Sequence, residues 1–317
     1  MFSYRHAFHA GNHADVLKHT VLIATLDHLL EKEAALTVVD THAGAGLYRL
    51  DGDYAGTSGE AADGILRLIS PPKEPGTTAP AAKSAIKKAA PEAEAPLADA
   101  IARYLGVIGD FNPKGGARVY PGSPFIVQHL LRDHDKLKLF ELHPTDARTL
   151  DANIAQLEAG RQIAVLREDG FGSATKFLPP PSRRALVLMD PSYEMKTDYG
   201  RVLDFMAEAL KRFATGTYAV WYPIIPRPEA HDLPRRLKTM ATKAGKSWLH
   251  ATLTVKSSKI TKDAASGETH RPGLPASGMF LINPPYTLKP MLAAALPQLV
   301  ERLGQDRNAA FSLDSGG

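Results

Sequence analysis

The first strong pattern of apolar and polar positions begins at His13 and predicts a helix that continues to about Glu33. At about 100° per residue its large apolar side chains fall within one stripe of roughly 140°. They are Val16, Leu22, Ile23, Leu26, Leu29 and Leu30. An apolar run over residues 34–39 then leads into Asp40, as in a buried strand, and ends in the glycine-rich turn THAGAG. Such a strand and turn open α/β nucleotide-binding folds.

Apolar runs alternate with amphipathic segments through the second half of the chain. Ser123 and Pro124 are a typical N-cap and first-turn proline before the helical segment FIVQHLL, and another helix is predicted over residues 144–158. Six further runs read as strands: KLKLFE, QIAVLRED, RRALVLMD, TYAVWYP, WLHATLTV and GMFLIN. Together with the first run they predict an α/β fold with a seven-stranded, mostly parallel sheet that carries helices on both faces.

An insertion interrupts this alternation. The segment from Pro71 to Pro96 holds six prolines, eight alanines and four lysines, with Ile86 as its one large apolar residue. It buries too little surface to offset the entropy of ordering, so we expect it to be disordered. Residues 98–108 again follow a helical pattern. We therefore predict a domain formed by residues 1–50 and 116–317, with residues 51–115 as a small helical insertion.

Composition narrows the class of protein only moderately. The 317 residues include 38 Lys and Arg against 34 Asp and Glu, a net charge of +4, which suits a nucleic-acid partner and many other partners equally well. The absence of cysteine excludes disulfides and thiolate metal sites. The N-terminus lacks the apolar stretch of a secretory signal, and no apolar run reaches the roughly 18 residues of a membrane span. These features lead us to expect a soluble, cytoplasmic protein that is not held by a membrane.

Acidic residues follow three of the predicted strands, at the edge where a parallel sheet binds its ligands. Asp40 precedes the glycine turn, Glu141 could accept hydrogen bonds from ribose hydroxyls, and Asp169 with Gly170 could reach an adenine amine. Each of these positions could also be an ordinary turn or a solvated carboxylate. Three of them in succession favour a ligand site.

The turn Asp190-Pro191-Ser192-Tyr193 follows the fourth strand and carries the strongest chemical signal. Amino-methyltransferases of similar sequence have Asp, Asn or Ser, then two prolines and an aromatic residue, at this place. The lone pair of an adenine N6 is delocalised into the ring, so the amine needs acceptors that orient it toward the methyl donor. Asp190 and the Pro191 carbonyl could accept both N6 hydrogens, Asp190 could take the proton, and Tyr193 could stack on the base. Ser192 departs from the pattern, and an Asp-Pro turn with a core tyrosine is the structural alternative.

The chain as a whole resembles the 23S ribosomal RNA adenine-N6 methyltransferase family RlmJ. The resemblance rests on SYRHAFHAGNHADVLKH, DTHAGAG, YPGSP, ELHP, DG, SRRALVLMDPSYEMKTDY, RFATGTYAVWYP and SGMFLINPP. It implies a class I, Rossmann-like methyltransferase fold, S-adenosylmethionine as cofactor and an adenine of large-subunit rRNA as target, swung out of its helix. We expect a monomer that does not act on DNA.

The resemblance also implies roles for individual residues. Asp190 would be catalytic, and Tyr4 would meet the RNA together with Tyr193. The residues that would contact the cofactor are His19, His42, Ser123, Glu141, Asp169, Gly170 and Asp190. By pattern alone, His19 is a buried helix residue and Ser123 an N-cap, so their cofactor roles depend on the family.

Other charged residues permit weaker hypotheses. Histidines 6, 9, 13 and 19 are not accompanied by the set of acidic or sulfur ligands that a metal site needs, so we expect no metal site. Five basic residues could contact RNA phosphates, although each could equally be a solvated charge. They are Arg5, Lys18, Arg183, Arg184 and Lys196.

Two rival functions stay open at this point. The chemistry of the Asp190 turn fits a DNA adenine-N6 methyltransferase as well, and the departure at Ser192 allows an inactive RNA-binding scaffold of the same fold. A second turn, Asn283-Pro284-Pro285-Tyr286, matches the amino-methyltransferase tetrapeptide better than the turn at Asp190 does. We expect it to lie away from the site, because it follows the seventh strand, which runs antiparallel in class I methyltransferases.

Overall fold

The structure is a computed structural model that describes residues 8–51, 60–69, 96–259, 261–262, 269–270 and 273–317. Tyr4 and Arg5 lie outside the described residues, as does nearly all of the Pro/Ala-rich segment. Among the described residues no helix is both long and apolar enough to cross a bilayer.

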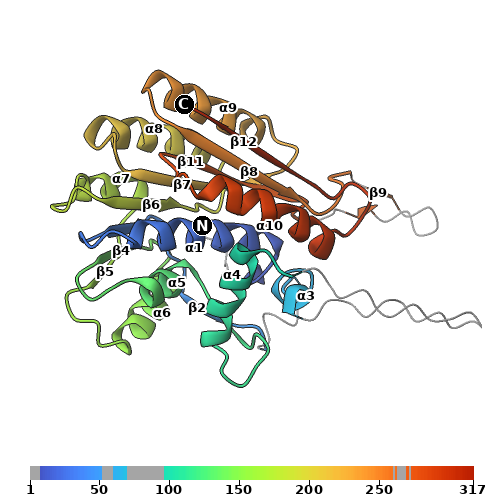
Figure 1. Ribbon diagram of the computed structural model, residues 1–317, viewed down its shortest axis with the longest axis horizontal. Coiled ribbons are helices and arrows are strands. Elements are labelled where there is room, and N and C mark those ends of the chain that lie inside the picture. Colours follow the sequence, from blue (N-terminus) through green and yellow to red (C-terminus); the bar gives the residue numbers. More distant parts are fainter. Residues whose placement is uncertain (1–7, 52–59, 70–95, 260, 263–268, 271–272) are drawn as a thin grey trace, which may run out of the picture.

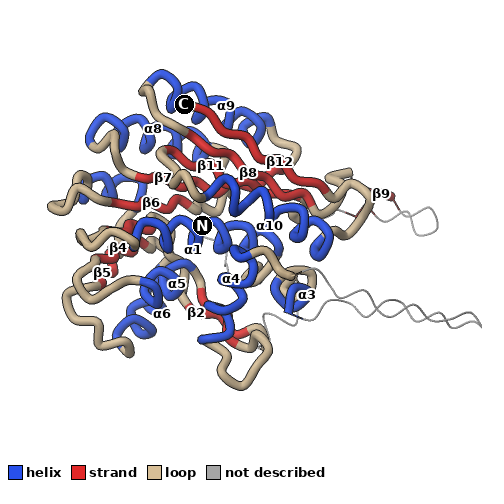
Figure 2. The backbone as a smooth tube through the Cα atoms, viewed as in Figure 1, coloured by secondary structure: helices blue, strands red, loops and turns tan. Residues whose placement is uncertain are grey.

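One eight-stranded sheet organises the chain, in the order β12-β8-β11-β7-β6-β1-β4-β5 (Figure 2). Its strands are β1 (Thr37–Asp40), β4 (Lys136–Phe140), β5 (Ile163–Leu166), β6 (Ala185–Met189), β7 (Thr217–Ile224), β8 (Trp248–Thr254), β11 (Ala276–Ile282) and β12 (Ala310–Gly316). The prediction of seven strands is therefore wrong by one. The missed strand, β12, pairs with β8 at the edge and has only two large apolar residues, Phe311 and Leu313.

Strand directions agree with the predicted fold class. The strands from β5 to β7 are parallel, whereas β11 lies antiparallel between β7 and β8. In chain order β11 is the seventh strand of this sheet, between the fifth and the sixth. This is the doubly wound, Rossmann-like arrangement expected from the sequence, with one further strand at its edge.

Both faces of the sheet are covered by helices. In β6, Leu186 and Leu188 enter one hydrophobic cluster while Val187 and Met189 enter the other. The first cluster includes residues of α1 (His13–Leu30), α3 (Ile65–Ile69), α4 (Asp99–Asp110), α5 (Ser123–Leu130) and α10 (Leu288–Leu303). The second includes residues of η2 (Ala174–Phe177), α8 (Thr197–Arg212) and α9 (Pro228–Lys243). Two further helices, α6 (Pro144–Ala155) and α7 (Gly170–Ser173), follow β4 and β5.

Helix α1 is more enclosed than its apolar stripe predicts. Every residue from His13 to Leu26 is buried, including Asp15, Lys18 and His19. The reason is tertiary: α4 and α10 pack against α1 in addition to the sheet, and Figure 1 shows α1 and α10 side by side. Polar residues of α1 are thereby confined to the interior, where they need partners.

The described part of the insertion shares the main core. Ile65, Leu68, Ile101 and Tyr104 belong to the same hydrophobic cluster as α1. The strands β2 (Leu47–Arg49) and β3 (Val119–Pro121) flank the insertion and pair antiparallel, so the chain leaves the domain and re-enters it at one place. A second small ladder joins β9 (Thr261–Lys262) to β10 (Thr269–His270).

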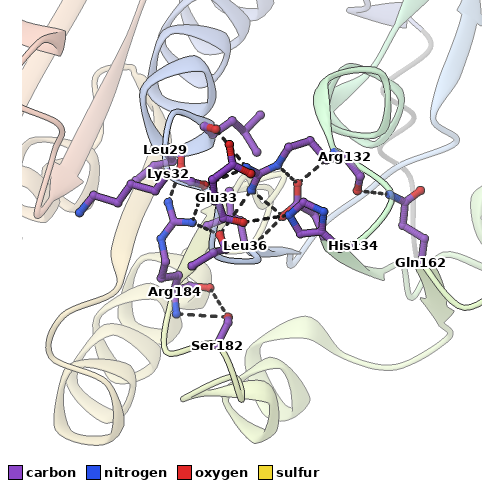
Figure 3. Close-up of polar contacts among 12 residues, drawn as sticks. Leu29, Lys32, Glu33, Leu36, Arg132, His134, Gln162, Ser182 and Arg184 are labelled. Carbon is purple, nitrogen blue, oxygen red and sulfur yellow. Dashed lines mark hydrogen bonds and ion pairs between the residues drawn. The ribbon is translucent and has the colours of Figure 1, made fainter.

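Two arginines hold the turn between α1 and β1 at the amino end of the sheet (Figure 3). Arg132 donates to the carbonyl oxygens of Leu30 and Lys32, at 3.2 and 2.8 Å, and Arg184 donates to those of Leu29, Lys32 and Ala34. These carbonyls have no partner within the helix, so the guanidinium groups satisfy them. These bonds give Arg184 a structural role, and its contact with phosphate stays a prediction.

Candidate active site

A cavity of about 390 Å³ lies at the carboxyl ends of β1, β4, β5 and β6. Its walls are the loops 41–44, 141–143, 169–171 and 190–195, and α1 contributes Lys18 and His19. The parallel strands end at one edge, so acidic residues far apart in the sequence meet there. All seven residues that the resemblance assigns to the cofactor line this cavity.

The glycine turn after β1 is fixed by Glu141. The Gly44 amide donates to Glu141 Oε2 at 2.7 Å, and the His143 amide donates to Oε1 at 2.7 Å. Burial raises the pKa of Glu141 in spite of these two bonds. Gly44 has φ +63°, and a Cβ there would lie 2.4 Å from the Tyr48 hydroxyl, so the turn needs glycine. Glu141 is thus a constrained pocket residue rather than a solvated loop carboxylate.

Asp169 both caps helix α7 and lines the cavity. Its Oδ1 accepts the Phe171 amide at 3.1 Å as the N-cap of α7, and Arg201 of α8 donates to Oδ2. The Arg201 guanidinium also lies 4.4 Å from the centre of the Phe171 ring. A Cβ on Gly170 would lie 2.1 Å from the Thr41 carbonyl oxygen, so only glycine allows β1 and β5 to end this close together.

Asp40 is a completely buried carboxylate beneath the cavity. Its Oδ2 accepts a 2.6 Å bond from the Ser123 hydroxyl, and Oδ1 accepts one from the His42 amide at 3.2 Å. Burial raises the pKa of Asp40 to about 6, although both bonds act to lower it. The N-cap prediction for Ser123 is wrong. Gly122 is the N-cap, and Ser123 is the first helical residue, with its hydroxyl directed to Asp40.

Two of the three histidines that line the cavity, His42 and His19, lie in different settings. Burial lowers the pKa of His42 to about 3, so the imidazole is neutral at physiological pH, and its edge packs on Phe171. His19 Nδ1 lies 2.8 Å from the Tyr120 hydroxyl, which lies 3.1 Å from that of Tyr104. This buried chain connects the cavity with α4 of the insertion.

The strongest electrostatic feature is the buried series Asp15, Lys18 and Asp190. Lys18 Nζ lies 2.8 Å from Asp15 Oδ1 and 2.5 Å from Asp190 Oδ2. Burial by itself would lower the pKa of Lys18, but the two carboxylates outweigh it and raise the pKa above its ordinary value. The hypothesis that Lys18 contacts phosphate is therefore wrong. A sequence signal did exist, because an Asp and a Lys three residues apart lie on a helix of mostly apolar residues.

Tyr193 does not occupy the position that stacking on a base requires. Its φ of +53° turns the side chain away from the cavity, and the ring is 2% exposed. The hydroxyl donates to the Trp221 carbonyl oxygen at 2.7 Å, and the ring packs on Tyr199 at 4.6 Å between centroids. The prediction that Tyr193 offers a stacking face is corrected by this arrangement, which is the core tyrosine of the structural alternative.

Asn283 lies at the opposite end of the sheet, as expected from its strand. Its amide donates to the carbonyl oxygens of Ala214 and Gly216, at 3.0 and 2.7 Å, just before β7 begins at Thr217. The cavity lies at the carboxyl ends of the parallel strands, so Asn283 has no access to it. The residues that follow Asn283 lead into α10, which begins at Leu288.

The N-terminal histidines that the structure describes have protein partners. His9 Nδ1 pairs with Glu60 at 2.9 Å, and His13 Nε2 bonds to the Leu274 carbonyl oxygen at 2.9 Å. Within the described ranges no three potential ligand residues gather into a metal-binding group.

Comparisons with known proteins agree on one family. A family model described as "Ribosomal RNA large subunit methyltransferase D, RlmJ" matches residues 33–314. The chain is 40% identical to ribosomal RNA large subunit methyltransferase J of Escherichia coli K12 and 38% identical to that of Haemophilus influenzae. These alignments cover 96% and 99% of this chain, and 94% and 98% of the relatives. The crystal structure of protein LPL1258 from Legionella pneumophila is similar at 28% identity and a TM-score of 0.75, over 98% of this chain and 99% of that one.

Proposed function

The chain belongs to the ribosomal RNA large subunit methyltransferase family RlmJ, and from this premise we propose that it methylates the N6 amine of an adenine in 23S rRNA. It is an rRNA methyltransferase that uses a cofactor of the S-adenosylmethionine type. One observation carries the finer proposal: the Asp190 turn shares a cavity with the acidic ends of β4 and β5.

The residues of the cavity fit S-adenosylmethionine. Its volume of about 390 Å³ lies in the range of small-molecule sites. Gly44 and Gly170 let the loops of its wall approach the neighbouring backbone and side chains closely, because a Cβ at either position would clash with Tyr48 or Thr41. Glu141 would accept bonds from the ribose hydroxyls, and Asp169 with Gly170 would hold the adenine. The remaining residues on the cofactor side would be His19, His42 and Ser123. When bound, the cofactor supplies a methyl group on a positively charged sulfur.

Asp190 would orient the target amine. Lys18 holds Oδ2 of this carboxylate, which leaves Oδ1 to accept one N6 hydrogen while the Pro191 carbonyl accepts the other. These two acceptors would direct the nitrogen lone pair toward the methyl group. Oδ1 would then take the proton that the amine loses. The acceptors are in place before the substrate binds, because the buried Lys18 fixes the carboxylate.

The target adenine would enter as a single flipped base. The cavity is lined from several loops and from α1, so a base stacked in a helix cannot reach Asp190. Ser192 lies on the cavity wall and takes part in no step, because the acceptor atoms come from Asp190 and Pro191. Its presence in place of the second proline therefore leaves the proposed chemistry intact.

Transfer of tritiated methyl groups to undermethylated rRNA tests the proposal, followed by mapping of N6-methyladenine in 23S rRNA. We expect one modified adenine with the wild-type protein and none with Asp190→Ala. Transfer to DNA but not to rRNA would instead support a DNA methyltransferase. Cofactor binding without transfer to either polymer would support an inactive scaffold, and both results contradict the proposal.

A further inference from the structure

On the Asp190 side of the cavity, another side chain must take the place of the aromatic ring that was expected to stack on the target base. The ring of Tyr193 is buried between Tyr199 and Trp221, and its hydroxyl is bonded to the backbone. A flipped adenine that lies against Asp190 would still have an apolar face to cover. Enzymes that flip a base hold it between aromatic or apolar side chains.

Among the residues that the structure describes, Met195 is the large, exposed apolar side chain on that side. It lines the cavity, follows the Asp190 turn by two residues, and is 63% exposed. Its backbone is fixed, because its carbonyl oxygen accepts the Asp198 amide at 3.0 Å where α8 begins. The side chain is thus exposed to solvent on an anchored backbone, whereas most large apolar residues of the described chain are buried.

Two other apolar residues of the cavity wall are not buried, and both lie on the cofactor side. Leu142, 47% exposed, directly follows Glu141, the residue suited to the ribose. Phe171 follows Asp169 and Gly170, and its ring is already in contact with Arg201 and His42. Neither residue adjoins Asp190 in the chain. Because Leu142 and Phe171 adjoin the acidic residues suited to the cofactor, Met195 is the exposed apolar side chain that remains for the substrate.

We propose that Met195 packs on the face of the target adenine and takes the role that Tyr193 cannot fill. This inference rests on the proposed function. A flexible thioether suits the task, because sulfur makes favourable contacts with aromatic rings and the unbranched chain adapts to the position of the base. Binding would also remove from water an apolar side chain that is otherwise exposed.

The variant Met195→Ala tests the proposal against Met195→Leu, with Phe311→Ala as the matched control. Phe311 is also an exposed large apolar residue, at 42%, but it lies on the edge strand β12. For Met195→Ala we expect the KM for an rRNA fragment to rise about tenfold, the scale of one lost base contact, with a smaller change in kcat. The Kd for S-adenosylhomocysteine and the Tm should stay at wild-type values, Leu should restore most of the affinity, and the control should behave as wild type.

Each other outcome counts against the inference. A KM within twofold of wild type in Met195→Ala would overturn it while leaving the proposed function intact. An equal rise in the Kd for S-adenosylhomocysteine would place Met195 on the cofactor side and overturn it as well. If the wild-type protein transfers no methyl group to rRNA, the proposed function fails first and the inference fails with it.

Discussion

Two turns of this protein have nearly the same sequence pattern and lie at opposite ends of one sheet. Asp190-Pro191-Ser192-Tyr193 follows β6, and Asn283-Pro284-Pro285-Tyr286 follows β11. Both strands are completely buried, and both turns contain a left-handed residue, Tyr193 at φ +53° and Asn283 at φ +52°. Their tyrosines have opposite environments, since Tyr193 is 2% exposed and Tyr286 is 82% exposed.

The direction of the preceding strand explains the different roles. A turn after a parallel strand reaches the edge where the other parallel strands end, and a turn after an antiparallel strand reaches the other edge. Asp190 consequently meets the buried Lys18 and a cavity, whereas Asn283 meets backbone carbonyl groups. The better match to a short motif is therefore the turn that lies away from the cavity.

The same contrast extends to the charged groups at the two ends. At the carboxyl end, Lys18 joins two carboxylates, one of which lines the cavity. At the amino end, Arg132 and Arg184 donate to carbonyl oxygens of the turn after α1 (Figure 3). Both sets are partly or wholly buried, but of the two only the first includes side chains that line the cavity.

The largest expected effect comes from Asp190→Ala. Removal of the acceptor that orients the amine should lower kcat by about 10³-fold. The fold should persist, since Lys18 keeps its pair with Asp15, and RNA affinity should change little because it depends on distributed phosphate contacts. Single-turnover methyl transfer and RNA binding measure these two quantities. A kcat above a tenth of the wild-type value would contradict the assignment of Asp190.

Lys18→Met should have the second-largest effect. Its kcat should fall about 100-fold, because Asp190 loses the group that fixes its carboxylate. The cation that lies between the carboxylates of Asp15 and Asp190 would be lost, so the free energy of unfolding should fall by roughly 3 kcal/mol. Adding Asp15→Asn should recover part of the stability and none of the activity. Chemical denaturation and single-turnover rates separate these effects, and a double variant as active as wild type would refute the positioning role of Lys18.

Asp40→Asn should weaken cofactor binding about tenfold and stabilise the fold at neutral pH. Burial raises the pKa of Asp40 from 3.8 to about 6, so the folded protein binds a proton more tightly than the unfolded chain. The contribution of Asp40 to stability is therefore lost as pH rises from about 4 to 6, at a cost that approaches ~3 kcal/mol. Urea denaturation of both proteins between pH 4 and 8 measures it. A stability difference that does not change over pH 4 to 6 would be inconsistent with this origin.

Asn283→Ala should leave kcat within twofold of wild type and lower the free energy of unfolding by about 1–2 kcal/mol. The substitution removes two donors to backbone carbonyls and places alanine at φ +52°. Asn283→Gly is the control, since it loses the same donors but accepts this φ. Thermal denaturation and a methyl-transfer assay measure the two effects. A folded Asn283→Ala protein with a tenfold loss of kcat would remove the contrast between the turns.

Local sequence patterns determined much of this fold and of its site. Apolar runs identified seven of the eight strands, and the class I fold that the resemblance implies placed GMFLIN antiparallel and away from the cavity. The acidic residues after the parallel strands could be located because each one follows a strand that the sequence predicts. Strand β12 escaped detection because an exposed edge strand needs few large apolar residues.

Only the tertiary structure decided which groups face one another. Ser123 bonds to Asp40 across 83 positions, and Lys18 pairs with Asp190 across 172. The enclosure of α1 by α4 and α10, and the inward turn of Tyr193, likewise depend on distant segments and on one backbone angle. Periodicity records whether a residue is buried, because burial recurs with the repeat of a helix or strand. Periodicity does not indicate which residue a buried polar group contacts, because that contact depends on the packing of segments that are far apart in the chain.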